Sequence, residues 1–69
     1  MKKCCVLGLG YIGLPTAAIL ADSGYEVFGY DVKSEIVEKI NNSEIHIIEN
    51  NLLELVQKVV KSKKLLAIE

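Results

Sequence analysis

The feature that most constrains this chain is a glycine-rich segment near its start, residues 8–13, which reads G-L-G-Y-I-G. The uninterrupted apolar run at residues 4–7 precedes it, and such runs are typical of strands buried on both faces of a parallel sheet. After it, small residues recur at every fourth position from Gly13 to Ala21, a spacing that places them on one helix face. The sequence therefore predicts a buried strand, a tight glycine turn and a helix over residues 12–23 that lies close against the sheet.

The next segment predicts a second strand and a second helix. Residues 25–30 are mostly aromatic or β-branched and end at Asp31, which is typical of a strand. Gly24 is placed to end the first helix, and Ser34 is placed to cap the second. Asn41 and its neighbour follow the apolar face of this second helix and are expected to end it.

The last third of the chain predicts another helix and the beginning of a third strand. Asn51 and Glu54 have the spacing of a reciprocal cap at the start of a helix, and residues 65–68 are apolar. Alternating strands and helices favour a parallel α/β sheet with right-handed crossovers. The expected fold is a Rossmann-like parallel sheet, limited to its first β-α-β-α-α-β half.

Composition excludes several classes of protein. The 69 residues suffice for one small domain, and a hydrophobic content of 51% excludes intrinsic disorder. A net charge of −1 argues against nucleic acid or an anionic membrane as the main partner, and no apolar run is long enough to span a bilayer. Cys4 and Cys5 are adjacent, so they cannot form an ordinary disulfide together, and they are expected to be buried in the first strand. No residue pattern suggests a metal site, and the chain is expected to be cytoplasmic.

Each glycine of the motif has a distinct expected role in binding a diphosphate. Gly8 permits the tight turn, Gly10 leaves the backbone open to the ligand, and Gly13 allows helix and strand to pack closely. The pyrophosphate would then lie at the helix N-terminus, on the free amide groups of Tyr11 and Ile12 and near the positive end of the helix dipole. This context predicts a dinucleotide-binding site.

Asp31 is the candidate ligand for the adenosine ribose. It lies 18 residues after Gly13, at the end of the second predicted strand, where such an acid is expected. Its carboxylate would accept hydrogen bonds from the ribose hydroxyls and repel a 2′-phosphate, so the sequence favours NAD over NADP. A glycine turn without a ligand, with Asp31 as a simple strand-end residue, remains the alternative.

The remaining polar and aromatic residues have more ordinary interpretations. The ring of Tyr11 is expected to be exposed, with the backbone doing the binding. Tyr25, Phe28 and Tyr30 are expected in the core, and His46 is expected to be solvated or hydrogen-bonded locally. None of these residues forms a catalytic constellation.

Residues 8–18, G-L-G-Y-I-G-L-P-T-A-A, closely resemble the N-terminal signature of the UDP-glucose/GDP-mannose dehydrogenase family. Residues 43–49, S-E-I-H-I-I-E, further resemble a segment of its UDP-N-acetyl-mannosamine branch, and residues 64–67 resemble the start of the family's third strand. The resemblance covers the whole chain but only the beginning of the family's longer proteins. Ser43 stands where relatives usually have glycine.

The resemblance implies a four-electron oxidation of a nucleotide sugar. Such enzymes convert the 6-hydroxymethyl group to a carboxylate with two NAD, through a thiohemiacetal on a cysteine. In the branch concerned, the product is UDP-N-acetyl-mannosaminuronate for cell-surface polysaccharide. The matching positions of this chain are its cofactor residues: Gly8, Gly10, Tyr11, Ile12, Gly13 and Asp31.

The catalytic residues and the sugar-binding domain of the family would lie beyond Glu69, and Cys4 and Cys5 do not match the family's nucleophile. Residues 1–69 are therefore expected to be a partial NAD-binding domain, truncated in its third strand, with no catalytic residue and no activity alone. A non-catalytic NAD-sensing module and a non-functional remnant are the alternatives. An open edge beside the first strand would favour self-association.

Overall fold

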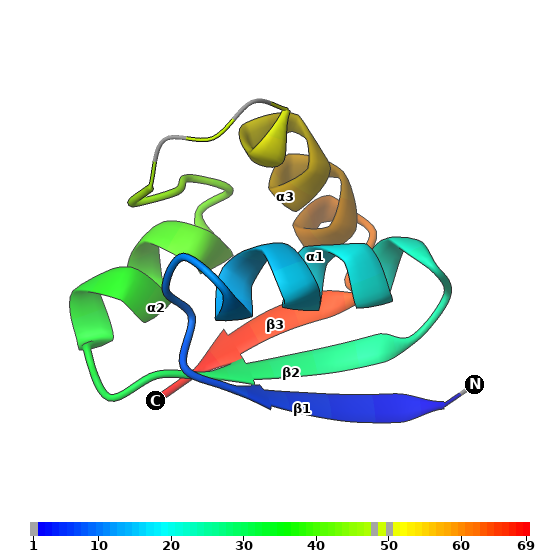
Figure 1. Cartoon of the computed structure of the whole chain (residues 1–69), viewed down its shortest axis with the longest axis horizontal. Helices are drawn as coiled ribbons and strands as arrows, with labels where there is room; N and C mark the ends of the chain where they lie inside the picture. Colours follow the sequence, from blue (N-terminus) through cyan, green and yellow to red (C-terminus); the bar gives the residue numbers. More distant parts are fainter. Residues whose placement is uncertain (1, 48, 50) are drawn as a thin grey trace.

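The computed structural model describes residues 2–47, 49 and 51–69. Figure 1 shows its helices and strands in the predicted order β-α-β-α-α-β. They are β1 (Lys3–Leu7), α1 (Gly13–Asp22), β2 (Glu26–Tyr30), α2 (Ser34–Asn41), α3 (Leu52–Lys61) and β3 (Leu65–Ile68).

The strands form one parallel sheet in the order β1-β2-β3. In this register Cys5 lies beside Phe28, which in turn lies beside Leu66. The helices α1, α2 and α3 all lie on the same face of the sheet (Figure 1). These observations confirm the expected Rossmann-like half, in which the carboxyl ends of the strands meet at one edge.

The core lies between the sheet and the helix layer. From α1 the small side chains of Ala17, Ala18 and Ala21 are fully buried, so this helix approaches the sheet closely, as its pattern predicted. Val27 and Leu65 are buried beneath the helices on β2 and β3. The other buried hydrophobic residues are Leu9, Leu14, Ile40, Ile47, Leu52, Val56, Val59 and Ala67.

The opposite face of the sheet is not covered by any described residue. Cys4 and Val6 of β1 pack against the core, whereas Cys5 is exposed and Leu7 is 77% exposed. The prediction that this strand is buried on both faces is therefore wrong for this chain, and so is the prediction that Cys5 is buried. Tyr30 was expected in the core, but it is also exposed, because every helix lies on the other face.

Each helix ends with a residue in the left-handed conformation. Gly24 has φ +105° after α1, which confirms its predicted role, whereas Ser43 and Lys63 have φ 62° after α2 and α3. The amide of Gly24 donates to Ala21 and the next amide donates to Leu20, which is the Schellman pattern. The same pair of hydrogen bonds recurs at the ends of α2 and α3.

Two predicted helix caps are wrong. The N-cap position of α2 is Lys33, and Ser34 is the first residue of the helix itself. Asn51 does occupy the N-cap of α3, but it has φ 66° and its side chain makes no capping hydrogen bond. The reciprocal cap predicted with Glu54 therefore does not form, because the left-handed backbone directs the Asn51 side chain differently from an extended N-cap residue.

Candidate functional site

The glycine-rich loop connects β1 to α1 at the carboxyl edge of the sheet. Gly8 has φ +88°, a conformation that glycine adopts without strain, and its amide donates to the carbonyl of Tyr30 over 2.7 Å. A Cβ at Gly13 would overlap the carbonyl oxygen of Gly8 and lie 3.6 Å from Val6. The chain itself therefore requires glycine at both positions, for the turn and for the close packing of α1.

Gly10 is different, because the chain itself leaves room for a side chain there. A Cβ built on Gly10 would meet no atom within 4 Å. Within the described residues, the amides of Gly10, Tyr11 and Ile12 donate no hydrogen bond, while the amide of Leu14 donates to Gly10 over 3.1 Å. Unpaired amides at the start of a helix are the kind of donor that binds anions, so the geometry of this loop is compatible with the expected pyrophosphate.

Asp31 directly follows β2 and is hydrogen-bonded to the glycine-rich loop. Its Oδ2 accepts the amide proton of Leu9 over 2.9 Å, and its Oδ1 accepts the amide proton of Lys33 over 2.9 Å. These two hydrogen bonds hold the pKa of Asp31 below its ordinary value of 3.8. The bond from Leu9 lowers the pKa more than the bond from Lys33 does. The carboxylate is therefore ionised at neutral pH and retains lone pairs for further donors.

A hollow of about 230 Å³ lies between the loop and Asp31. It is lined by Leu7, Gly8, Tyr30, Asp31 and Val32. Leu7 and Val32 are largely exposed, so the hollow combines apolar walls with a single carboxylate. This combination suits an adenosine, whose base is flat and apolar and whose ribose donates hydrogen bonds.

Leu9 and Gly29 form a support for the loop that the sequence pattern did not reveal. Leu9 is completely buried, and a Cβ on Gly29 of β2 would lie only 2.7 Å from a Leu9 methyl group. Gly29 thus leaves space for the side chain that anchors the middle of the loop. The only signal in the sequence is the glycine inside a strand, which often marks a close approach.

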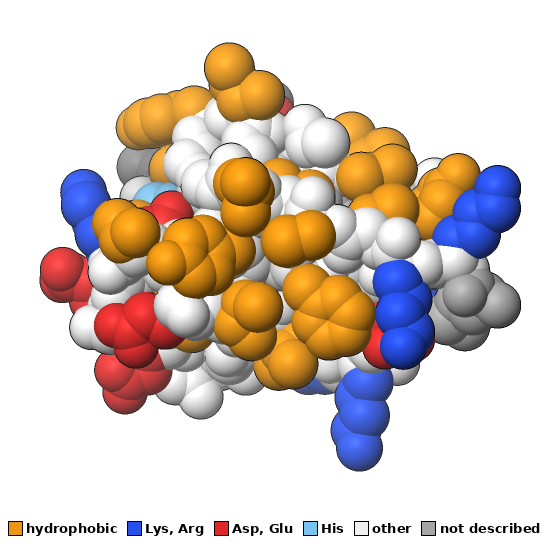
Figure 2. All heavy atoms as spheres, turned by 90° about the horizontal axis from the view of Figure 1, so that it is seen from below, with side chains coloured by type: hydrophobic (Ala, Val, Ile, Leu, Met, Phe, Trp, Pro, Cys, Tyr) orange, Lys and Arg blue, Asp and Glu red, His pale blue; other side chains and the backbone are white. Residues whose placement is uncertain are grey.

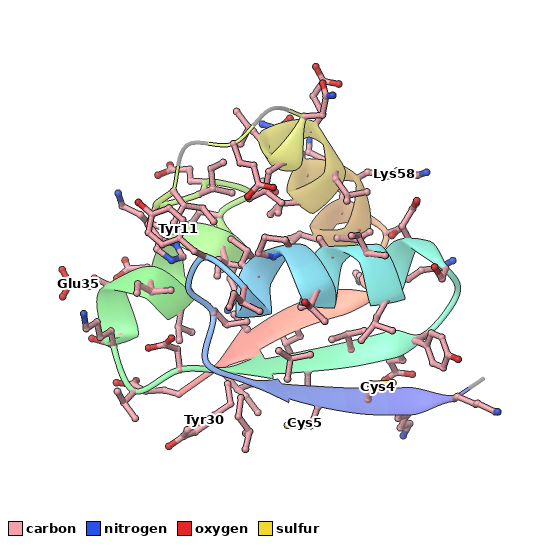
Figure 3. All side chains as sticks on the ribbon, viewed as in Figure 1. Cys4, Cys5, Tyr11, Tyr30, Glu35 and Lys58 are labelled. Carbon is pink, nitrogen blue, oxygen red and sulfur yellow. The ribbon has the colours of Figure 1, made fainter. Side chains whose placement is uncertain are left out.

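Tyr11 and His46 lie away from the sheet surface. The Tyr11 side chain, which is labelled in Figure 3, is 74% exposed in the glycine-rich loop. His46 lines a hollow of about 280 Å³ with Lys33, Glu35, Ile36 and Lys39. Both of its ring nitrogens are buried, and among the described residues neither has a hydrogen-bond partner. The ring nitrogens are thus not exposed to bulk solvent, and the predicted local hydrogen bond is not found in this part of the chain.

The two cysteines lie on opposite sides of β1 (Figure 3), and both thiols are free. Among the described residues, no group of three or more histidine, cysteine, aspartate or glutamate side chains is arranged to hold a metal ion. In the same part of the chain, no helix is long and apolar enough to cross a bilayer.

The parallel sheet, the glycine turn into α1 and the acid after β2 define a dinucleotide-binding domain of the Rossmann type. The family whose sequence profile matches residues 2–69 is described as the UDP-glucose/GDP-mannose dehydrogenase family, NAD binding domain. The chain belongs to this family, and its residues 2–69 match the family's NAD-binding domain. This confirms the resemblance seen in the glycine signature, and NAD as the cofactor.

Individual relatives agree with the family. The chain is 55% identical over 65 residues to the UDP-N-acetyl-D-mannosamine dehydrogenase of Methanococcus maripaludis, covering 94% of this chain and 15% of the relative. The solved UDP-N-acetyl-mannosamine dehydrogenase from Pyrococcus horikoshii superposes with a TM-score of 0.95 at 47% identity, over 99% of this chain and 16% of that one. A UDP-glucose dehydrogenase from Pyrobaculum islandicum gives a TM-score of 0.95 at 39% identity, over 100% and 16%.

The chain therefore spans only about 15% of the length of the curated relatives that it matches. The relatives are oxidoreductases that act on nucleotide sugars, as their names state, and this chain matches their NAD-binding part.

Proposed function

We propose that this chain is the N-terminal NAD-binding part of a nucleotide-sugar 6-dehydrogenase that oxidises UDP-N-acetyl-mannosamine to UDP-N-acetyl-mannosaminuronate. Two NAD would accept the four electrons, and the product would serve surface polysaccharide synthesis. The observation that carries the proposal is the open space at Gly10, beside the free amides at the start of α1. The 55% identity to a UDP-N-acetyl-D-mannosamine dehydrogenase supports the choice of substrate.

The proposed roles divide the cofactor between the loop and Asp31. The amides of Gly10, Tyr11 and Ile12 would hold the pyrophosphate, because they are unpaired within the described residues and lie at the positive end of the α1 dipole. Asp31 would accept hydrogen bonds from the adenosine ribose, since its carboxylate borders the apolar hollow after β2. NAD supplies the hydride acceptor, and the residues of this chain only bind and orient it.

In the same proposal, residues 1–69 are a partial domain that binds NAD weakly and catalyses nothing alone. Cys4 packs against the core and Cys5 lies on the open sheet face, and neither lines the hollow beside Asp31. The UDP-sugar would contact parts of the longer protein. We further propose a cytoplasmic location and self-association of the isolated chain, for which the outer edge of β1 is the surface suggested by the sequence.

The proposal is tested by titrating the chain with NAD, followed by calorimetry. Replacing Asp31 with alanine should weaken binding by roughly 10- to 100-fold, because a hydrogen bond to a charged group contributes about 1.5–3 kcal/mol. Asp22→Ala is the matched control, since Asp22 lies at the far end of α1 and pairs with Lys58 over 2.8 Å at the surface. Circular dichroism would confirm that both variants fold, and equal affinities for all three proteins would remove Asp31 from the site.

A further inference from the structure

The middle of the glycine-rich loop is fixed to the sheet by one buried side chain. Leu9 is fully buried, whereas Tyr11 and Ile12 of the same loop are 74% and 83% exposed. A Cβ built on Gly29 of β2 would lie 2.7 and 3.1 Å from the two methyl carbons of Leu9, and 3.4 Å from the carbon that bears them. Leu9 therefore occupies the space that any larger residue at position 29 would need.

The backbone of Leu9 is hydrogen-bonded to the candidate ribose ligand. The amide of Leu9 donates to Oδ2 of Asp31 over 2.9 Å, across 22 residues of sequence. The preceding amide, that of Gly8, donates to the carbonyl of Tyr30 over 2.7 Å. Two consecutive loop residues are thus bonded to two consecutive residues at the end of β2. Because the side chain and the amide of Leu9 belong to one residue, the position of the side chain constrains the direction of the amide.

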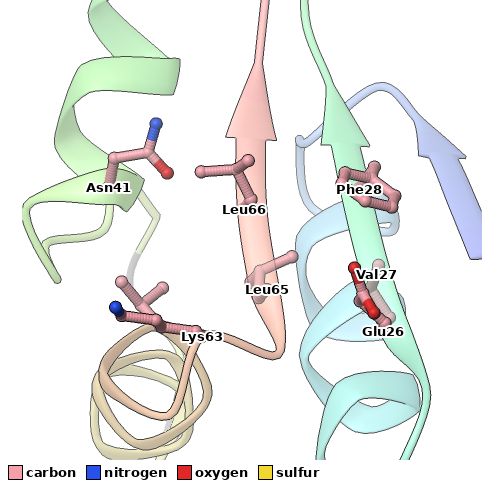
Figure 4. A pocket seen from close by; sticks show the side chains of 8 residues that line it. Glu26, Val27, Phe28, Asn41, Lys63, Leu65 and Leu66 are labelled. Atoms are coloured by element: carbon pink, nitrogen blue, oxygen red, sulfur yellow. The ribbon is translucent and has the colours of Figure 1, made fainter. Parts of the chain in front are cut away.

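The backbone of Gly29 is held from both sides, so β2 cannot easily shift to make room for a side chain. Gly29 is in register with Val6 of β1 and with Ala67 of β3. The side-chain amide of Asn41 donates to the Ala67 carbonyl over 2.8 Å, and its oxygen accepts the Ala67 amide proton over 2.9 Å. Figure 4 shows Asn41, from α2, beside β3. The group that would have to move is therefore Leu9.

Gly29 faces the helix layer of the molecule. Side chains alternate along a strand, and the neighbouring Tyr30 lies on the opposite face, where Figure 2 shows hydrophobic side chains gathered. A side chain at position 29 would thus point toward the loop. Since Leu9 is fully buried in a close-packed interior, its methyl groups could withdraw only by displacing their neighbours or the loop.

We infer that Gly29 is a positioning residue of the proposed NAD site. Its missing side chain provides the space for Leu9 under the loop, and Leu9 in that position directs its amide to the carboxylate of Asp31. Gly29 does not line the hollow beside Asp31, so it acts through Leu9 and not by contact with the ligand. The inference rests on the proposed function for the role of Asp31, whereas the link from Gly29 to Asp31 belongs to the chain without any ligand.

The link fixes the orientation of the carboxylate before a ligand arrives. The amide of Leu9 holds Oδ2 of Asp31, and the amide of Lys33 holds Oδ1, both over 2.9 Å. Each oxygen keeps a lone pair for a ribose hydroxyl. A carboxylate that is already oriented loses less conformational entropy on binding, so a displaced Leu9 amide should weaken the binding of NAD.

The inference is tested by replacing Gly29 with alanine and following the side-chain carboxyl carbon of Asp31 by NMR as a function of pH. The pKa of Asp31 should rise toward its ordinary value of 3.8, because the bond from the Leu9 amide is the largest cause of its depression. The charges of Lys33 and His46, which also lower this pKa, remain in the variant. NAD affinity, measured by calorimetry, should fall roughly three- to tenfold, the range that one hydrogen bond contributes.

A compensating substitution separates positioning from general loss of stability. Leu9→Val combined with Gly29→Ala keeps the number of side-chain carbon atoms and should restore both the low pKa of Asp31 and the NAD affinity. Val27→Ala is the matched control, because Val27 is buried on the same face of β2. This variant should lower the free energy of unfolding and leave the pKa of Asp31 and the NAD affinity unchanged.

A folded Gly29→Ala chain in which the pKa of Asp31 stays as low as before would overturn the inference. So would an equal rise of this pKa in Val27→Ala. Should Gly29→Ala not fold, Leu9→Ala tests the same link from the other side: the loop loses its buried anchor, and a pKa of Asp31 that does not rise would overturn the inference. If the unmodified chain does not bind NAD, the proposed function fails, while the pKa comparison still decides whether Gly29 positions Asp31.

Discussion

Gly10 and Gly13 lie three residues apart in the glycine-rich motif, yet a side chain would meet different surroundings at each. At Gly13 a methyl group would collide with the backbone of Gly8, whereas at Gly10 it would meet no atom of the chain within 4 Å. Folding of the chain therefore requires glycine at position 13. Folding does not require it at position 10, where we expect that a ligand approaching the loop needs the space.

This difference predicts opposite effects for two otherwise identical substitutions. Gly13→Ala should lower the free energy of unfolding by about 1–3 kcal/mol, because the backbone must shift to accommodate the methyl group. Gly10→Ala should change it by less than about 0.5 kcal/mol but lower NAD affinity at least tenfold, because the methyl group would occupy the place proposed for the pyrophosphate. Chemical denaturation and NAD titration measure the two quantities. NAD affinity unchanged in Gly10→Ala would contradict the assignment of the loop.

Asp31 predicts a pH dependence of stability. Hydrogen bonds from the amides of Leu9 and Lys33 lower its pKa in the folded chain, so the unfolded state binds a proton more readily. Its contribution is therefore fully present above the unfolded pKa, close to 3.8, and is lost as the pH falls through the lower folded value. The stability difference between the unmodified chain and Asp31→Asn should shrink below about pH 3.8, as measured by urea unfolding at several pH values. A constant difference down to pH 2 would contradict it.

At the scale of elements, the helix ends show which features the sequence could and could not reveal. Gly24 was predicted to end α1 because glycine adopts positive φ readily, and it does. Ser43 and Lys63 end their helices with the same hydrogen bonds, although neither residue type favours this conformation. Because serine and lysine do not signal a positive φ, the sequence alone did not reveal these two turns.

Ser43→Gly should therefore stabilise the chain. A left-handed conformation costs an ordinary residue about 1–2 kcal/mol, and the greater freedom of glycine in the unfolded chain offsets part of this gain. A net increase of about 0.5–1 kcal/mol in the free energy of unfolding is expected from thermal and urea denaturation. Ser23→Gly, at a position with φ −82°, is the control and should not stabilise. A loss of stability in Ser43→Gly would show that its hydroxyl group has a role that the turn geometry does not explain.

For the molecule as a whole, the sequence correctly predicted the fold class, the order of strands and helices along the chain, and the location of the glycine turn. These depend on local periodicity and on the spacing from Gly13 to Asp31. The exposure of the sheet face opposite the helices was missed, because a continuous apolar strand is typical of burial on both faces. The contacts of Leu9 with Gly29 and of Asn41 with Ala67 were missed because they join residues far apart in the sequence.

The hydrogen bonds of Asn41 also set a direction for the sheet. Because the Ala67 backbone at the outer edge of β3 is already bonded to a side-chain amide, a fourth strand would pair more favourably alongside β1, next to the loop proposed to hold the dinucleotide. A strand paired there would lie on the side where the cofactor is proposed to bind and would form a second wall beside it.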